Sequence, residues 1–117
     1  MSNRIYSDGY RVVQRTEAVH PTKGGAHAFY EVVRVSDDEE LDLLCFQHDT
    51  IPAVGVQGWT NEAVLAVVID RLRGFQAGAF ACRENALAIT KCEEALMWLE
   101  KRTADRKARH VEGTHEA

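Results

Sequence analysis

The chain has 117 residues, 45% of them hydrophobic and 27% charged, a composition that fits one globular domain with a modest core. Its formal net charge of −4 opposes a role as a general nucleic-acid coat, and no apolar run approaches the roughly 20 residues that cross a membrane. The N-terminus lacks the apolar core of a signal peptide, so we expect a cytoplasmic protein. Length, charge and the lack of a long apolar run together lead us to expect one domain (1–117) and neither DNA nor membrane partners. Cys45, Cys82 and Cys92 follow no framework spacing and are expected to be reduced, mostly buried thiols.

Residues 1–56 predict a small antiparallel β-sheet of three or four strands. Runs rich in Val, Thr, Tyr or alternating apolar residues predict strands over 10–19, 29–35 and 41–47. Residues 53–56 are a candidate for a short fourth strand. The polar residues 1–9 are expected to be loosely held, and the proline and glycines at 20–25 predict a turn. The acidic run 36–40 is interpreted as a solvated turn, because its spacing matches no calcium-binding loop.

Residues 57–117 predict an antiparallel hairpin of two helices, Asn61–Gln76 and Arg83–Arg109, because the break between them is too short for anything but a sharp reversal. Thr60 is the expected N-cap of the first helix, and Gly78 is expected to adopt a positive φ just past its end. Two apolar stripes at helical spacing should face each other: Leu65, Val68, Ile69, Leu72 and Phe75 on the first helix, and Ala88, Ile89, Cys92, Ala95, Leu96 and Leu99 on the second. The complete expectation is an α+β fold in which the small sheet packs on the hairpin.

Two features of the second helix have more than one interpretation. Met97 and Trp98 lie beside the apolar stripe and suit either a core position under the sheet or an oligomer interface. The segment Lys101–Arg109 carries a local net charge of +4, because five basic residues stand against Asp105 alone. Such a stripe in an acidic protein suits a small anion, although solvated surface charge is the favoured interpretation when the stripe is taken alone.

The sequence gives little support for catalysis, a metal site or DNA reading. Cys45-x-x-His48 is half of a zinc motif, but the remaining histidines are irregularly spaced. The serines lie in turns or tails, and the adjacent Glu93 and Glu94 point apart on a helix. A second helix of about 27 residues, about 40 Å long, is too long for the recognition helix of a compact DNA reader. We therefore expect no enzyme, no cofactor and no bound metal.

The stretch from about residue 46 to the C-terminus is similar to a known family. The similarity is carried by VVIDRL over 67–72, GFQAG over 74–78, FACRENALA over 80–88, EEALMWL over 93–99, Arg102-Thr103, and VEGTH over 111–115. These motifs resemble the helical hairpin domain shared by phage anti-Thoeris and anti-CBASS sponge proteins. The β segment that precedes them points to the anti-Thoeris branch.

The resemblance implies both a function and a set of contact residues. Family members are oligomeric sponges, commonly hexamers built from dimer units, that bind cyclic nucleotide signals of bacterial immunity without cleaving them. The anti-Thoeris branch binds glycocyclic ADP-ribose, and some members also hold cyclic oligonucleotides. If the chain is phage-encoded, the resemblance implies that it acts in the host cell cytoplasm. The resemblance implies that four of the ligand-contacting positions of the family fall on Phe75, Asn85, Arg102 and Arg106.

These four residue types suit a cyclic nucleotide. A base needs an aromatic face and an amide for its edge, which Phe75 and Asn85 supply, and a pyrophosphate needs the guanidinium forks of Arg102 and Arg106. Asn85 and Arg102 are 17 positions apart on one helix, about 25 Å along its axis, whereas a cyclic nucleotide spans only about 10 Å. Binding by all four residues therefore requires a second, antiparallel protomer. Two alternatives stay open: an enzyme that degrades the nucleotide, for which His110 or His115 would be the base, and an oligomerising structural or regulatory protein.

Overall fold

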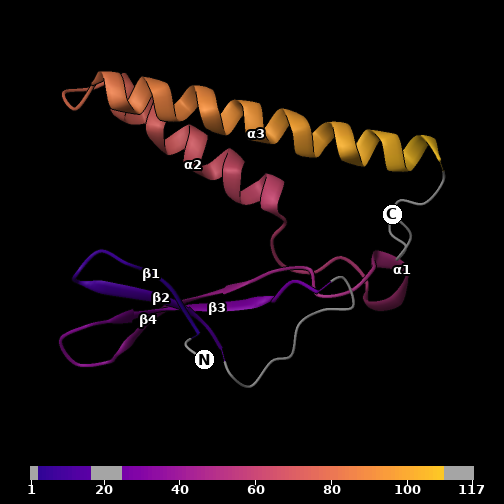
Figure 1. The fold of residues 1–117 in the computed structure, drawn as a ribbon, viewed down its shortest axis with the longest axis horizontal. Coiled ribbons are helices and arrows are strands. Elements are labelled where there is room, and N and C mark those ends of the chain that lie inside the picture. Colours follow the sequence, from indigo (N-terminus) through magenta and orange to yellow (C-terminus); the bar gives the residue numbers. More distant parts are fainter. Residues whose placement is uncertain (1–2, 17–24, 110–117) are drawn as a thin grey trace. The chain divides into compact units, whose positions relative to one another are not determined.

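The computed structural model describes residues 3–16 and 25–109, to which every structural statement below refers (Figure 1). Four antiparallel strands come first and helices follow, which confirms the predicted α+β class. The chain divides into two compact units between Trp59 and Thr60. We call them the β unit (3–16 and 25–59) and the helical unit (60–109). No helix of the described residues is long and apolar enough to span a membrane.

The β unit contains one antiparallel sheet whose strands follow chain order. The strands are β1 (Arg4–Ser7), β2 (Arg11–Arg15), β3 (Phe29–Arg34) and β4 (Glu40–Cys45), in the order β1-β2-β3-β4. Val12 pairs with Val33 and Val13 with Val32, so β-branched residues pack beside each other on both faces of the central strands. The three strands predicted over 10–19, 29–35 and 41–47 are confirmed, with shorter bounds. Much of the turn predicted at 20–25 lies outside the described residues.

The expectation that residues 1–9 are loosely held is wrong for the described residues 3–9, because β1 pairs with β2 through a tight turn. Asp8 Oδ1 accepts hydrogen bonds from the backbone N–H groups of Tyr10 at 2.8 Å and Arg11 at 2.7 Å, and Gly9 supplies a φ of +89°. The bond from the Arg11 N–H, and then that from Tyr10, lowers the pKa of Asp8. A polar segment can form an edge strand in this way, because strand pairing uses the backbone and polar edges resist further pairing.

The candidate strand at 53–56 is also wrong, because residues Ile51–Val54 form a one-turn helix, α1. Pro52 stands in its first turn, where the missing N–H costs nothing, and Gly55 ends the turn with a φ of +78°. The side-chain amide of Gln47 holds the loop. Its Nε2 donates to the Gly55 carbonyl at 2.8 Å, and its Oε1 accepts from the Gln57 N–H at 2.8 Å. Local proline chemistry therefore outweighs the apolar alternation that suggested a strand.

The segment after α1 returns to the end of β4. The Trp59 N–H donates to the Cys45 carbonyl at 2.9 Å, and the Gln47 N–H donates to the Trp59 carbonyl at 2.9 Å. Gly58 has a φ of +52°, and a Cβ at this position would overlap the Cys45 carbonyl oxygen. Glycine is therefore required here by both backbone conformation and space.

The helical unit is the predicted antiparallel hairpin of α2 (Asn61–Gln76) and α3 (Arg83–Ala108) (Figure 1). The Thr60 side chain accepts a hydrogen bond from the Ala63 N–H at 3.1 Å, which confirms the predicted N-cap. Ile69 is buried at 4% exposure, and most of the second predicted stripe is half-buried, as are Leu65 and Leu72 of the first. The stripe residues Val68, Phe75 and Ala95 are exposed.

The reversal between α2 and α3 differs from the prediction, because Gly78 does not adopt a positive φ. Instead, α2 ends at Ala77 with an ordinary φ of −80°, and the Gln76 side chain closes the turn. Its Oε1 accepts a hydrogen bond from the Cys82 N–H at 2.8 Å, which satisfies a donor at the start of α3.

One expectation about burial is corrected. None of the three cysteines is buried: Cys82 is exposed, and Cys45 and Cys92 are half-buried. Met97 and Trp98 are 53% and 57% exposed, so α2 does not cover them within the helical unit, and a position under the sheet stays a prediction. Their role in an oligomer interface stays a prediction.

Candidate ligand-binding site

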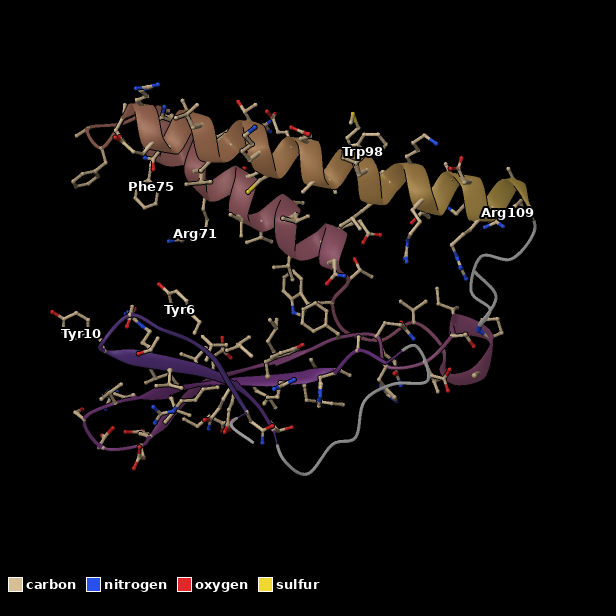
Figure 2. All side chains as sticks on the ribbon, in the orientation of Figure 1. Tyr6, Tyr10, Arg71, Phe75, Trp98 and Arg109 are labelled. Carbon is tan, nitrogen blue, oxygen red and sulfur yellow. The ribbon has the colours of Figure 1, made fainter. Side chains whose placement is uncertain are left out.

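The hairpin tip brings two aromatic rings together. Phe75 lies in the last turn of α2 and Phe80 in the reversal that follows, with ring centroids 6.3 Å apart and planes inclined at 76°. Phe75 is 41% exposed and Phe80 73% exposed. Figure 2 shows Phe75 near this end of α2, with Arg71 one helical turn earlier. The tip therefore presents a nearly perpendicular pair of rings to solvent, an arrangement that aromatic pairs favour.

Asn85 lies in the first turn of α3 and is tied to the same tip. Its Nδ2 donates a hydrogen bond to the Phe80 carbonyl at 3.2 Å. Among the described residues the Asn85 side chain makes no other hydrogen bond, so its amide oxygen and second N–H proton are available to a ligand. Together with the Gln76–Cys82 bond, this contact closes the reversal from both sides. We call Phe75 and Asn85 the aromatic–amide pair.

Arg102 and Arg106 form a second pair, the guanidinium pair, near the C-terminal end of α3. They are four residues apart and so lie on neighbouring parts of one helix face, Arg102 exposed and Arg106 half-buried. On the same part of α3, Lys101 pairs with Asp105 at 3.0 Å, which neutralises part of the local charge. Arg106 lies in the last turn of α3, where a cation complements the helix dipole, so this residue also has a structural role.

One chain does not bring the two pairs together. Asn85 and Arg102 lie on the same continuous helix, 17 positions apart, which separates them by about 25 Å along the axis. By contrast, Phe80 brings Phe75 and Asn85 to one place, through its ring and its carbonyl respectively. The tip is therefore a local cluster and the guanidinium pair is a separate one.

Two residues at the tip were not among the predicted contacts. The first is Phe80, which lies in one of the sequence motifs similar to the family and is exposed. The second is Arg71, whose guanidinium carbon lies 5.8 Å from the centroid of the Phe75 ring. The available signals were an aromatic residue inside a very short reversal, and the four-residue spacing of Arg71 and Phe75 on a helix.

Within the residues that the structure describes, no group of three His, Cys, Asp or Glu side chains is placed to hold a metal ion. The two histidines weighed as a catalytic base, His110 and His115, lie outside those residues.

The comparisons with known proteins bear on the same hairpin. The model of a family described as the Acb2/Tad1 hairpin domain matches residues 40–104, which is more than half of the chain. The chain belongs to the Acb2/Tad1 hairpin family. This confirms the family expected from the sequence motifs. The matched range contains Phe75, Asn85 and Arg102 and ends two residues before Arg106.

A curated relative of this Acb2/Tad1 hairpin protein comes from Bacillus phage SBSphiJ7 and is named Thoeris anti-defense 1. The two sequences are 59% identical over 77 residues, which are 66% of this chain and 54% of the relative. The chain therefore spans about half the length of the relative that it matches. The contact roles of the four predicted residues stay predictions.

Proposed function

We propose that the protein is a non-catalytic sponge that binds and sequesters cyclic nucleotide immune signals. The principal ligand would be of the glycocyclic ADP-ribose type, with cyclic oligonucleotides as a second class. Binding would keep the signal from activating the effectors of bacterial anti-phage defence, in the cytoplasm of the host cell. The observation that carries the proposal is the family membership, together with a relative named for anti-defence against Thoeris.

The tip chemistry supports a base-binding role. An adenine ring stacks on an exposed aromatic face, and its edge exchanges hydrogen bonds with a side-chain amide that can donate and accept. Phe75 offers such a face, and Asn85 keeps an amide oxygen and one N–H proton for a ligand while its other proton is bonded to Phe80. The turn is held by side-chain hydrogen bonds on both sides, so little conformational entropy is lost on binding.

The guanidinium pair supports recognition of a pyrophosphate. Arginine forks form two parallel hydrogen bonds to phosphate oxygens, which a single charged point does not provide. Because the two pairs are about 25 Å apart in one chain, the arginines at each ligand would come from an antiparallel neighbouring protomer. A two-fold arrangement would give two equal pockets for each dimer, and dimers would assemble into hexamers. Exposed Met97 and Trp98 would supply apolar surface for such contacts.

A mass-balance experiment tests sequestration against degradation. The full chain is incubated with a slight deficit of glycocyclic ADP-ribose, and free ligand is measured after ultrafiltration. The protein is then heat-denatured, and released ligand is measured by liquid chromatography with mass spectrometry. A sponge binds one ligand molecule per pocket and therefore depletes the free ligand. Because it does not change the ligand, denaturation should release all of it intact. Recovery of a linear or hydrolysed product would show that the protein is an enzyme.

The Phe75→Ala variant serves as the matched control in the same experiment. It should leave the free ligand in the filtrate, since the stacking ring is gone while the fold, formed mainly by other residues, persists. A wild-type protein that also leaves the ligand in the filtrate would contradict the proposal for this ligand.

A further inference from the structure

Within the described helical unit, the ring of Phe80 packs edge-to-face on Phe75 and is otherwise largely open to solvent. Phe80 is 73% exposed. The Gln76 and Asn85 side chains close the reversal through hydrogen bonds to backbone atoms, so these bonds do not involve the Phe80 ring. A large exposed aromatic ring contributes little to the stability of the chain that carries it. Rings of this kind, held on a rigid turn, are typical contacts for a partner or ligand.

We propose that Phe80 is a second aromatic contact for the base of the ligand, an inference that rests on the sponge function proposed above. The planes of Phe75 and Phe80 are inclined at 76° with centroids 6.3 Å apart, so the two rings form the walls of a corner. A planar base stacked on one ring directs its edge toward the other ring, and this combination of stacked and edge-to-face contacts suits the π quadrupoles of both.

The position of Phe80 is fixed by Asn85. The Nδ2 of Asn85 holds the Phe80 carbonyl at 3.2 Å, so the same side chain that would read the edge of the base also holds the backbone of the second wall. Asn85 is thus both a ligand contact and a positioning residue for Phe80. The corner exists before binding, which lowers the entropic cost of ordering it around the ligand.

Arg71 indicates which class of ligand suits the corner. Its guanidinium lies over one face of the Phe75 ring, 5.8 Å from the centroid, so a base would stack on the opposite face with a positive charge close by. A purine that carries a phosphate nearby matches an aromatic corner with an adjacent cation. The corner would therefore prefer adenine-type nucleotides to uncharged aromatic molecules of the same size.

Calorimetry with glycocyclic ADP-ribose tests the inference on the full chain. Phe80→Ala should weaken binding about fivefold or more, as expected for loss of an aromatic contact to a base. Phe80→Leu should bind the ligand about as weakly as Phe80→Ala, because leucine keeps apolar area but has no π face. Phe80→Trp should bind the ligand with an affinity within about threefold of wild type. Leu87→Ala, which truncates an exposed apolar side chain on α3, is the matched control and should bind like wild type.

The outcomes separate this inference from the function on which it depends. If wild type binds and Phe75→Ala does not, but Phe80→Ala binds like wild type, only the role of Phe80 is overturned. If wild type itself does not bind, both the function and the inference fail for this ligand. Thermal unfolding and light scattering accompany each variant. A Phe80→Ala protein that changes its mass in solution would assign the ring to a protein interface and overturn its role as a ligand contact.

Discussion

The two-protomer pocket makes a quantitative prediction about mixtures of two defective variants. Phe75→Ala removes the stacking ring, and Arg106→Ala removes one guanidinium. Loss of a charged hydrogen bond costs about 1.5–3 kcal/mol, which weakens binding about 10- to 150-fold. Loss of a base-stacking ring costs about 1–3 kcal/mol. Each homogeneous variant should therefore bind glycocyclic ADP-ribose poorly.

Helix geometry determines how much binding a mixture recovers. The aromatic–amide pair and the guanidinium pair are about 25 Å apart in one chain, so each pocket takes one pair from each protomer. In a mixed dimer, one pocket receives both wild-type pairs and the other receives both changed pairs. Random assortment of equal amounts makes about half of the dimers mixed, so about one quarter of all pockets should regain wild-type affinity.

Calorimetry on the co-expressed variants measures this fraction directly. Mass spectrometry first verifies that the two chains are present in equal amounts, and the titration then counts high-affinity sites per chain. Two differently tagged copies of Phe75→Ala, co-expressed in the same way, should recover no such sites. A mixture of Phe75→Ala and Arg106→Ala that also recovers none, although both chains assemble together, would refute the shared pocket.

Three further predictions concern the fold. Gly58→Ala should lower the free energy of unfolding by at least about 1 kcal/mol, because a side chain there meets both a positive φ and the Cys45 carbonyl. Gly74→Ala, which adds a side chain in open space on α2, should raise the free energy of unfolding by about 0.5–1 kcal/mol. Equal effects of the two substitutions in chemical denaturation would contradict the reasoning. Thr60→Ala should cost about 1 kcal/mol by removing the N-cap bond of α2, and an unchanged denaturation midpoint would count against it. The lowered pKa of Asp8 means that its contribution to stability is complete above pH 3.8 and is lost as the pH falls through the lowered pKa; an NMR titration midpoint at or above 3.8 would disagree.

The helical unit could be predicted closely because its signals are local. A capping threonine, apolar residues at helical spacing and a short break give the bounds of α2 without error and those of α3 to within one residue. Sequence motifs in the same region also identified the family and nominated Phe75 and Asn85. These inferences need only residues that are close together in the chain.

The β unit was predicted less well because strand pairing is not local. The short β1, RIYS, forms a strand because β2 offers backbone partners across a tight turn, and the mainly polar residues 1–9 carry no periodicity that signals this pairing. In α1, the fixed φ of Pro52 favours a helical first turn over the strand that its apolar neighbours suggested.

The sequence by itself determined the α+β class, the two long helices, the family and the identity of the residues suited to a base and a pyrophosphate. Tertiary structure decided that Phe80 meets Phe75 ring against ring while its carbonyl is held by Asn85, and that Gln76 closes the reversal where a glycine conformation was expected. The physical reason is that these partners are only five or six residues apart but meet only through the conformation of the reversal between the helices, which apolar periodicity does not specify.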